Sequence, residues 1–385
     1  MSGVSVVHLA TSDMGVRYLL LDQLTLLRDR GFDVSAITSD GPYVRAVRAA
    51  GIPVRTVRMT RRISPIADVI ALVRLIRLLR RLRPDLVHTH TPKASLLGQW
   101  AARLAGVPRR VHTIHGLYFP GRLTPARRRL FALLERIEMM PAHIVLSQNQ
   151  EDLATARAER LCDPARLRFL GNGIDIDRFH PRNALPDRRD ATRRGIGLTP
   201  GRLVVGMVGR LVREKGYPEL FEAASLVRRV LPNATFAVIG GPEPGKADAL
   251  TDADIDRARE RLGDGLVMLG HRDDVPALIG AMDLLVLPSH REGFPRALME
   301  ASATGVAVVA TDVRGCREAV VAGVTGALVP VADPPALAAA ILRLLQEPST
   351  RASYGQAGRR VAEERFDQRI VFERVVQAYR ELGLD

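Results

Sequence analysis

Cysteine is scarce in this chain of 385 residues, which holds only Cys162 and Cys316, far apart in the sequence. Two distant cysteines do not form the disulfide framework of a small secreted protein, and they indicate a reducing compartment. Either could be a reactive thiol, although cysteine more often serves as a small buried hydrophobic residue. Aromatic residues are also few, at 4%, so the cores of this protein must be mostly aliphatic.

Long hydrophobic runs without charge are absent as well. No stretch of 18 apolar residues is free of charged side chains, which argues against a transmembrane helix. The best candidate, PIADVIALVRLIRLLRRLRP, carries arginines at helical spacing and therefore predicts an amphipathic helix. The opening VSVVHLA has no basic leader, so we expect a first strand there and no secretory signal.

Several catalytic signatures are also missing. The sequence has no GxGxxG, no GxxxxGK[ST], no GxSxG elbow and no Cys/His nucleophile signature. The DxD pattern, a carboxylate pair that binds metal in one class of sugar transferases, occurs at 175–177 and at 252–254. The first lies in a presumed linker, and the second opens a helix, where acidic residues need no metal to explain them. We therefore expect no metal site at either.

What the chain does contain indicates a soluble globular protein of two domains. Hydrophobic residues make up 46% and charged residues 25%, and the length exceeds what one ordinary core supports. Short β-branched runs such as VSVVHLA, FDVSAITS, DLVHTHT and RVHTIHG alternate with amphipathic segments, one of them a basic helix around 125–139. This alternation predicts an α/β fold with parallel sheets covered on both faces.

The alternation restarts after residues 181–201, which are rich in Pro, Gly and charge and are interpreted as part of the domain junction. The second series begins with LVVGMVG and continues with helices near 216–230 and 251–263. We predict two doubly wound domains facing across a cleft, with ligands at the carboxyl ends of the strands. The expected divisions are an N-terminal domain over 1–185, a C-terminal domain over 186–362 and a final crossing helix over 363–385.

The positive charge is concentrated in the first half of the sequence. Residues 1–185 hold 29 of the 56 Lys and Arg and 15 of the 42 Asp and Glu, so they account for the whole net charge of +14. An arginine-rich genome would raise the arginine content of both halves alike, whereas a basic half beside a neutral one predicts an anionic partner. A membrane surface or a phosphorylated acceptor is favoured over nucleic acid, because no basic-aromatic pattern accompanies the charge.

The segment GMVGRLVREKG, 206–216, predicts an anion site. A hydrophobic strand ends in glycines, including Gly209, that let a backbone approach a ligand closely. Arg210 and Lys215 then precede a helix, so two cations lie at a strand end beside a helix N-terminus. The simpler alternative is a solvated basic turn.

The segment HREGFPRALME, 290–300, holds Glu292 and Glu300 around a Gly-Phe-Pro turn. Pro295 suits the first turn of a helix, whose free amides would favour a phosphate. Glu292 could accept hydrogen bonds from sugar hydroxyls, and Glu300 could hold a second diol such as a ribose. Two glutamates at this spacing arise readily by chance, so the prediction depends on the strand, turn and helix around them.

Histidines cluster in DLVHTHT and VHTIHG. His88 and His90 should share one face of a strand, but no Cys or carboxylate joins them at the spacing of a metal site. His115 ends a strand, where such sheets place functional groups, and it could hydrogen-bond a hydroxyl.

These segments together resemble glycosyltransferase family 4, the retaining nucleotide-sugar transferases of GT-B fold. The resemblance covers nearly the whole chain and includes HTHTPKASLLGQWAARLAGVPRRVHTIHG, GNGIDIDRFHP, GRLVREKGYPELFEAA, HREGFPRALMEASATGVAVVATDVRGCREAV and TGALVPVADPPALAAAI. The glutamate pair matches the E-x7-E element of this family. The sequence most resembles the branch that builds capsular polysaccharides and bacillosamine-type lipid-linked glycans, often with N-acetylated sugars from UDP and polyprenyl-diphosphate-linked acceptors.

The resemblance implies a role for each matching residue. Arg210 and Lys215, beside Gly209, would clamp the donor diphosphate, and Glu300 would bind the ribose. Glu292 would bind the donor sugar, together with the backbone of four residues: Gly293, Phe294, Pro295 and Arg296. His115 would reach the sugar from the N-terminal domain. His271 and Arg272 would lie near the base.

One segment departs from the family pattern. Many members carry a Gly-Gly loop near the donor phosphates after the first strand, whereas TSDMGVRYLL offers only Gly15 and places Met14 before it. The resemblance further implies no cofactor and no metal, provided that Arg210 and Lys215 neutralise the diphosphate. It also implies a cytoplasmic enzyme on the inner face of the membrane, held there by basic residues of the first half. These are Arg74, Arg77, Arg80, Arg81, Arg127, Arg128 and Arg129.

Three alternatives stay open at this point. A nucleotide-sugar 2-epimerase shares the architecture but would need catalytic carboxylates, for which the sequence has no clear signature. A transferase with a small soluble acceptor would use the same donor residues without needing the basic face. A non-catalytic relative should have lost some of Arg210, Lys215, Glu292 and Glu300, and all four are present.

Overall fold

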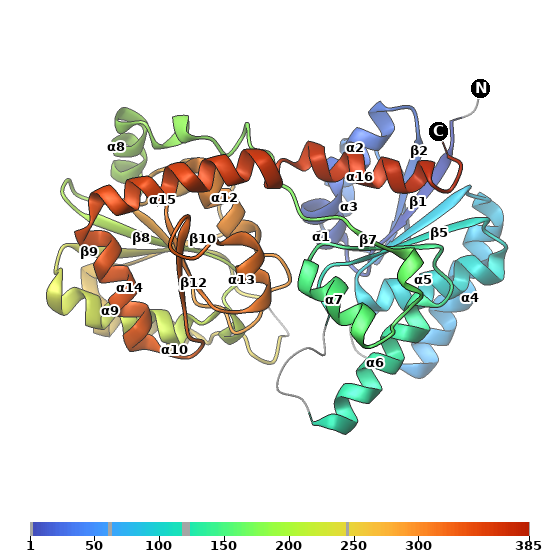
Figure 1. The fold of residues 1–385 in the computed structure, drawn as a ribbon, viewed down its shortest axis with the longest axis horizontal. Helices are drawn as coiled ribbons and strands as arrows, with labels where there is room; N and C mark the ends of the chain where they lie inside the picture. Colours follow the sequence, from blue (N-terminus) through green and yellow to red (C-terminus); the bar gives the residue numbers. More distant parts are fainter. Residues whose placement is uncertain (1–2, 61–63, 118–123, 244–245, 385) are drawn as a thin grey trace. The chain divides into compact units, whose positions relative to one another are not determined.

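The chain folds into two compact units, each built on one parallel sheet with helices packed against it (Figure 1). The computed structural model describes residues 3–60, 64–117, 124–243 and 246–384. Unit 1 comprises residues 1–171 and 371–385, and unit 2 comprises residues 172–370. The predicted class, two doubly wound α/β domains, is confirmed.

The sheet of unit 1 has seven parallel strands in the order β3-β2-β1-β4-β5-β6-β7. The register places Val6 of β1 opposite Val34 of β2 and Leu86 of β4. The strands are β1 (Ser5–Leu9), β2 (Asp33–Thr38), β3 (Val54–Thr56), β4 (Leu86–His90), β5 (Arg109–Ile114), β6 (Ile144–Ser147) and β7 (Leu167–Phe169). Their β-branched and aliphatic residues suit a pleated surface that is buried on both sides.

The two faces of this sheet are covered by different helices, because successive strand residues point in opposite directions. Val6 and Leu86 belong to a core that also contains residues of α2, α3 and α16. Val7 and Val87 belong to a core formed with α4 and α5. The helices are α1 (Asp13–Gly15), α2 (Leu21–Asp29), α3 (Val44–Ala49), α4 (Pro65–Leu82), α5 (Pro92–Ala105), α6 (Pro125–Met139), α7 (Gln150–Ala158) and α16 (Gln368–Arg380).

The predicted helices of unit 1 are found, with one interruption. The basic helix around 125–139 is α6. The amphipathic segment between VSVVHLA and FDVSAITS, RYLLLDQLTLLRDRG, is not one continuous α-helix, because Val16–Leu20 form a π-helical turn between α1 and α2. That wider turn shifts the helix face, so that Val16 and Leu20 are buried while Tyr18 and Leu19 are exposed.

The sheet of unit 2 has six parallel strands in the order β10-β9-β8-β11-β12-β13. They are β8 (Leu203–Val208), β9 (Ala234–Ile239), β10 (Leu266–Gly270), β11 (Leu284–Leu287), β12 (Val308–Thr311) and β13 (Gly326–Val329). The helices are α8 (Pro186–Gly195), α9 (Tyr217–Val230), α10 (Asp252–Leu262), α11 (Val275–Gly280), α12 (Arg296–Thr304), α13 (Arg314–Ala319), α14 (Pro334–Gln346) and α15 (Pro348–Val361). One aliphatic core joins this sheet to its helices.

The division between the units falls earlier than the predicted boundary at residue 185. Residues 172–185 belong to unit 2 because Ile174, Ile176 and Phe179 are buried in its core. The segment interpreted as a junction, 181–201, forms α8 and packs on the same unit. Its Arg193 Nη2 lies 2.7 Å from the carboxylate of Asp283, which is only 7% exposed. The buried Asp283 carboxylate thus holds a segment with the composition of a linker against unit 2.

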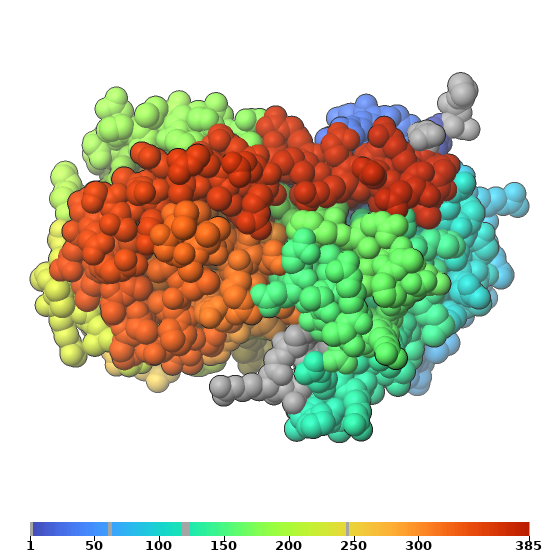
Figure 2. Space-filling model, viewed as in Figure 1, coloured from blue at the N-terminus to red at the C-terminus, as the bar shows by residue number. Residues whose placement is uncertain are grey.

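The C-terminal helix α16 begins in unit 2 and adds its later residues, from Val371 onward, to unit 1. Val375, Val376 and Tyr379 are buried in the same core as the N-terminal strands. In Figure 2 this red segment lies on the surface of unit 1 beside N-terminal segments drawn in blue. Among the described residues, no helix combines the length and the apolar character that crossing a membrane requires.

Candidate active site

The carboxyl edge of the unit 2 sheet contains a topological switch point between β8 and β11. From β8 the chain builds outward through β9 to β10, and it then returns to add β11 on the other side of β8. The loops that follow β8 and β11 therefore leave the sheet side by side and diverge. Open α/β sheets bind their ligands in the crevice that this divergence creates. Both segments singled out in the sequence, 206–216 and 290–300, begin at this point.

The loop after β8 presents Arg210 at the strand end. The Tyr217 hydroxyl donates a hydrogen bond of 2.7 Å to the Gly209 carbonyl, which fixes the start of the loop. The Arg210 guanidinium forms an ion pair with Glu243, in the segment after β9. Gly240 permits this approach, because a Cβ there would lie 1.8 Å from the Gly209 oxygen. Arg210 is therefore a cation at the strand end whose charge is balanced by a largely buried carboxylate.

Lys215 and Glu292 form a direct ion pair at the switch point. Lys215 ends a short 3-10 turn, Arg213–Lys215, that Gly216 closes in the left-handed region with a φ of 78°. Its Nζ lies 2.5 Å from Glu292 Oε1, and the Ser289 hydroxyl donates to the same oxygen at 2.6 Å. The Lys215 side chain is 18% exposed and that of Glu292 is 9% exposed. Sequence analysis missed Ser289, whose polar side chain directly after an apolar strand was the available signal.

The turn before α12 is held from both sides. Pro295 occupies the N-cap position of α12, and its side chain does not cap the first-turn amides. Asn172 Nδ2 donates to the Phe294 carbonyl at 3.3 Å. A Cβ on Gly315 would lie 2.6 Å from the Gly293 carbonyl, so only glycine lets α13 approach this turn. Such an uncapped N-terminus favours anionic groups.

Glu300 lies one turn into α12, and its side chain is 13% exposed. Burial raises the pKa of this carboxyl, and the nearby positive charges of Arg296 and Arg178 oppose the rise. Arg296 Nε lies 3.7 Å from the Glu300 carboxylate. Arg178 comes from the GNGIDIDRFHP segment, so the structure explains why that segment matters to the site.

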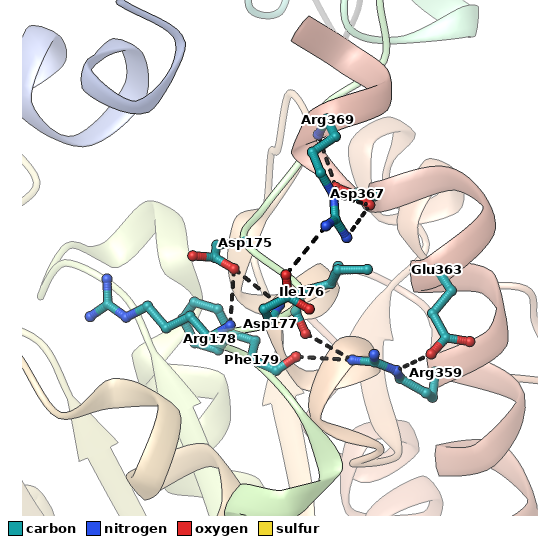
Figure 3. A network of polar contacts seen from close by, with 9 residues as sticks. All are labelled: Asp175, Ile176, Asp177, Arg178, Phe179, Arg359, Glu363, Asp367 and Arg369. Atoms are coloured by element: carbon teal, nitrogen blue, oxygen red, sulfur yellow. Dashed lines mark hydrogen bonds and ion pairs between the residues drawn. The ribbon is translucent and has the colours of Figure 1, made fainter. Parts of the chain in front are cut away.

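The first DxD pattern, at 175–177, lies in a turn of the GNGIDIDRFHP segment, and contacts within the protein explain its two carboxylates (Figure 3). Asp175 Oδ1 accepts hydrogen bonds from the amides of Asp177 and Arg178, at 3.0 and 2.9 Å. Arg359 Nη1 donates to the carbonyls of Ile176 and Phe179, at 3.0 and 3.1 Å. The Asp175 carboxylate thus caps a turn that carries Arg178 toward α12.

The remaining contacts around this segment are ion pairs. Arg369 pairs with Asp367 at 2.7 Å and with Asp177 at 3.4 Å, as Figure 3 shows. In the second DxD pattern, Asp254 forms a capping box with Thr251 at the start of α10. These contacts account for both patterns without a metal.

The two residues expected near the base follow β10. Arg272 donates two hydrogen bonds to the carboxylate of Asp274, at 2.8 and 2.6 Å. This contact raises the pKa of Arg272, which lies in an exposed position. His271 follows Gly270 directly, and a Cβ on Gly241 would lie 3.7 Å from the His271 Cβ. Both residues are at the carboxyl edge, on the β9–β10 side of the switch point.

Gly15 ends the short helix α1 after β1. Its backbone is right-handed helical, with a φ of −60°, and a Cβ there would find only ordinary contacts, the nearest at 3.5 Å. No feature of the backbone therefore requires glycine at this position. The predicted role of Gly15 near the donor phosphates stays a prediction.

His115 follows β5 in unit 1, and both of its ring nitrogens have polar contacts. Nε2 lies 3.1 Å from His90 Nδ1, and Nδ1 lies 3.2 Å from Gln148 Oε1. Burial lowers the pKa of His115 to about 4, so the imidazole is neutral at pH 7. His8 joins the cluster from β1, which the sequence analysis missed although its strand is the immediate neighbour of β4.

A carboxylate does lie beside one of these histidines, contrary to the expectation from sequence spacing. Glu138 of α6 lies 3.4 Å from His112 Nε2. Glu138 is 26 positions from His112 in the sequence, so only the folded helix brings the two together. Burial raises the pKa of Glu138 well above its ordinary value.

Comparison with known proteins shows which family this chain is similar to. Residues 188–361 match the family described as glycosyl transferases group 1, and residues 15–173 match the glycosyl transferase 4-like domain. A UDP-Gal:alpha-D-GlcNAc-diphosphoundecaprenol alpha-1,3-galactosyltransferase from Escherichia coli is 30% identical over 82% of this chain and 81% of its own length. The capsular polysaccharide biosynthesis glycosyltransferase CapM from Staphylococcus aureus is 28% identical over 98% of this chain and 97% of its own.

A solved structure shares the fold. The crystal structure of Anabaena HepE in complex with UDP and glucose superposes with a TM-score of 0.82 and is 23% identical in sequence. It covers 97% of this chain and 98% of its own.

Proposed function

This chain belongs to the group 1 glycosyltransferases, and from that premise we propose that it moves a sugar from a nucleotide donor to a polyprenyl-diphosphate-linked acceptor. The relative from Escherichia coli carries a UDP-sugar donor and a diphosphoundecaprenol acceptor in its name, and CapM is named for capsular polysaccharide biosynthesis. We accordingly propose UDP as the nucleotide and bacterial surface polysaccharide as the product. The proposed sugar, an N-acetylated hexosamine, follows the branch that the sequence resembles.

The observation that carries the proposal is the pairing of two cations with two carboxylates at the switch point. Arg210 pairs with Glu243, and Lys215 pairs with Glu292. A diphosphate entering between the loops can take over both cations, because phosphate oxygens form strong charge-assisted hydrogen bonds with Arg and Lys. Glu292 is then released to accept hydrogen bonds from sugar hydroxyls. The ion pairs thus keep the site charge-balanced until the donor replaces them.

The reaction is a substitution at the anomeric carbon. The bond from that carbon to the diphosphate oxygen breaks, which leaves a nucleoside diphosphate anion and an oxocarbenium-like sugar. Fixed cations and the free amides of α12 stabilise the departing negative charge without having to reorganise, and such preorganisation is usually the largest catalytic contribution. The acceptor oxygen bonds to the anomeric carbon, and its proton passes to the leaving phosphate oxygen.

We propose that this transfer retains the anomeric configuration by attack on the face that the diphosphate leaves. A double displacement would instead need a carboxylate nucleophile beside the sugar. Glu292 is the candidate, but its carboxylate accepts a hydrogen bond from Ser289 and its proposed task is to bind the sugar. A glycosyl group bound covalently to Glu292, detected by mass spectrometry of the trapped enzyme, would overturn this mechanism.

The other predicted site residues complete the donor site. Glu300 would hold the ribose, and the backbone of Gly293, Phe294, Pro295 and Arg296 would contact the sugar. We propose that His115 contacts the same sugar and that His271 and Arg272 lie near the base. Gly15 would lie near the phosphates.

We propose that no metal and no cofactor take part, because Arg210 and Lys215 together supply two positive charges to the diphosphate. This matches the formal charge of a nucleoside diphosphosugar, whose diphosphate diester carries two negative charges. Transfer should therefore persist in the presence of a chelator.

A membrane surface is the proposed location, on the cytoplasmic side, and α4 supplies the observation that supports it. Its buried side carries Ala71, Leu75 and Leu79. The opposite side begins with exposed apolar residues at helical spacing and continues with exposed arginines. These are Ile66, Val69, Ile70 and Val73, followed by Arg74, Arg77, Arg80 and Arg81. An apolar stripe beside basic residues is the pattern of a helix that lies in a membrane interface.

The decisive experiment measures nucleoside diphosphate release from a panel of UDP-, GDP- and ADP-sugars, with and without a polyprenyl-diphosphate-linked monosaccharide. Release from one donor only when the lipid is present supports the proposal and names the sugar. Release with a soluble sugar acceptor but not with the lipid would instead indicate natural-product glycosylation. A change in the donor sugar without any acceptor would indicate a 2-epimerase.

A further inference from the structure

A continuous chain of polar contacts runs through the buried histidines of unit 1. His115 Nδ1 lies 3.2 Å from Gln148 Oε1, and His115 Nε2 lies 3.1 Å from His90 Nδ1. His90 Nε2 in turn lies 3.0 Å from His8 Nδ1. The contacts cross three neighbouring strands, because His8 lies on β1, His90 lies on β4 and His115 follows β5.

From His8 the series of contacts continues to Tyr379, in the C-terminal helix α16. Its hydroxyl lies 3.2 Å from His8 Nε2 and 2.7 Å from His88 Nδ1. His88 Nε2 lies 2.7 Å from Thr113 Oγ1, which ends the series. Tyr379, His8 and His88 are completely buried. Every ring nitrogen of the four histidines thus has one partner.

One atom sets the direction of all these hydrogen bonds. Gln148 presents its carbonyl oxygen Oε1 to His115, and a carbonyl oxygen can only accept. The hydrogen of His115 is therefore on Nδ1. A neutral imidazole carries one such hydrogen, so His115 Nε2 must accept from His90 Nδ1, and the same argument applies to His8.

The Tyr379 hydroxyl then donates to His8 Nε2, because that nitrogen carries no hydrogen. The Tyr379 oxygen accepts in turn from His88 Nδ1, and Thr113 donates to His88 Nε2. All four imidazoles therefore share one tautomer, with the hydrogen on Nδ1. Because each bond depends on the next, the tautomer of His115 is coupled to a hydroxyl on the last helix of the chain.

The surroundings keep these rings neutral. Burial lowers the pKa of His8 to about 3 and that of His115 to about 4. Burial also lowers the pKa values of His88 and His90 well below the ordinary value, and the neighbouring histidines add to the effect.

A shared metal ion is the competing interpretation of this cluster. Ligand atoms of His8, His88 and His90 lie within 4.8 Å of one another. The rings of His88 and His90 are stacked, with centroids 4.2 Å apart, and each of their nitrogens lies within hydrogen-bond distance of another polar group of the cluster. The mutual hydrogen bonds already satisfy those nitrogens.

We propose that Tyr379, His8, His90, His115 and Gln148 form a histidine relay that positions His115 for sugar recognition. The relay holds His115 as a neutral hydrogen-bond donor through Nδ1, at the half-buried end where Gln148 is its partner. A sugar hydroxyl that takes the place of Gln148 would accept this hydrogen bond. His8, His90 and Tyr379 are positioning residues that act only through His115. The inference rests on the proposed function, since it names what prepares His115 for its substrate.

The tautomers can be tested without any assay of transfer. We would label the nine histidines of the full chain with 15N and assign the signals by single substitutions. The expected spectrum at pH 7 shows His8, His88, His90 and His115 neutral, each protonated on Nδ1. A cationic ring, an Nε2-protonated ring in the series or a tightly bound metal would overturn the relay. Because this result needs no substrate, it remains decisive even if the proposed transfer fails.

Kinetics then separate positioning from packing. His90→Phe keeps a ring but loses both nitrogens, whereas His90→Gln keeps a donor and an acceptor in a side chain of different shape. We expect His90→Phe to lower kcat about 10- to 100-fold, as misplacement of a site group does, with the donor KM within about twofold. His90→Gln should recover most of kcat. Equal activity of the two variants would overturn the proposal.

Tyr379→Phe is the subtler test, because it removes a single oxygen at the far end of the relay. It should move the 15N signals of His115, which lies three hydrogen bonds away, and lower kcat. Thr38→Val is the matched control, since Thr38 is a buried hydroxyl of the same unit that lies outside the relay. Unchanged His115 signals in correctly folded Tyr379→Phe would contradict the coupling.

Discussion

Glu292 illustrates what a single residue can and cannot reveal in the sequence. Its position after a strand and before a Gly-Phe-Pro turn predicted a place in the site, and the structure puts it at the switch point. Its contact with Lys215 could not be predicted, because no local pattern links residues 77 positions apart. That contact depends on which strands become neighbours, which is a property of the whole sheet.

At the residue scale, Arg210 offers a test with a matched control. Arg210→Met removes one cation from the proposed diphosphate site, and we expect UDP-sugar affinity to fall about 10- to 100-fold, because charge-assisted hydrogen bonds are lost. Arg202→Met is the control, since Arg202 also pairs with a carboxylate, Asp264, but precedes β8 at the opposite edge of the sheet. Calorimetric titration should show wild-type affinity for Arg202→Met. Equal losses in both variants would contradict the assignment.

The double variant Arg210→Met/Glu243→Gln refines this comparison. In the single variant, Glu243 keeps a negative charge without its cation and would repel the diphosphate. A smaller loss in the double variant than in the single one would show that part of the effect is this repulsion.

Glu300 predicts a pH dependence of donor binding. Burial raises the pKa of this carboxyl, so protonation sets in at a higher pH than for an ordinary glutamate. As pH falls through that raised pKa, the carboxylate loses the charge that would strengthen its proposed hydrogen bonds to the ribose, and affinity should decrease. Glu300→Gln should bind a UDP-sugar about tenfold more weakly at neutral pH and should lack this pH-dependent component. An intact UDP-sugar is the suitable ligand because its diphosphate diester does not titrate in this range.

The opposite result is equally clear. If the affinity of Glu300→Gln keeps the wild-type pH profile, Glu300 does not contact the ribose.

At the element scale, the strands and helices with strong periodicity were predictable, and the segments that depend on tertiary partners were not. β1, β2, β4 and α6 lie where the alternation placed them. The helix α8 was missed because 181–201 has the composition of a linker, and its arginines become helical against the buried carboxylate of Asp283. The π-helical turn at Val16–Leu20 was missed for a similar reason, since its hydrogen-bond pattern has no sequence signature.

The histidines on β1, β4 and β5 predict that unit 1 becomes less stable in acid. Their folded pKa values are lowered by burial, to about 3 for His8 and His112, below the unfolded value of about 6.5. Below the unfolded pKa, the unfolded chain binds protons that the folded chain does not. Each such histidine therefore costs about 1.4 kcal/mol of the free energy of unfolding per pH unit.

The single tryptophan, Trp100 on α5, reports on unit 1 alone. We expect its denaturant-unfolding midpoint to fall steeply between pH 7 and pH 5. His290→Gln should keep this slope, because His290 is an exposed histidine of unit 2. A midpoint that stays level over this range would show that the buried histidines are not held neutral.

The exposed face of α4 predicts binding to anionic membranes. Each arginine near such a surface contributes on the order of 1 kcal/mol, and the apolar stripe adds a contribution that salt does not screen. Ile66→Ser/Ile70→Ser should weaken binding to phosphatidylserine-containing vesicles in a sedimentation assay. Val230→Ser, an equally exposed position on α9 of unit 2, should not.

The same sedimentation assay, repeated at increasing salt concentration, tests the charge contribution to binding. Binding should weaken as ionic strength rises but should not vanish, because the apolar stripe remains. Association that ignores salt, or no association at all, would remove the proposed membrane role of the basic half.

At the scale of the whole molecule, the fold class followed from the alternation of strands and helices, and the family followed from segments spread over the chain. The boundary between the units did not follow, because Ile174, Ile176 and Phe179 are buried in unit 2 although they precede its first strand. The concentration of charge in residues 1–185 was visible in the sequence. The apolar stripe that accompanies it became visible only when the buried face of α4 was known.

The most direct test of the account is nucleoside diphosphate release with a UDP-sugar and a lipid-linked acceptor in vesicles, in the presence of a chelator. Wild-type enzyme should release UDP only when the lipid is present, and the chelator should not slow it. Lys215→Met should lower this rate at least about 100-fold, since it removes a preorganised charge that we propose to face the leaving group. Release that ignores the lipid, stops with the chelator or survives Lys215→Met would contradict the proposed transfer.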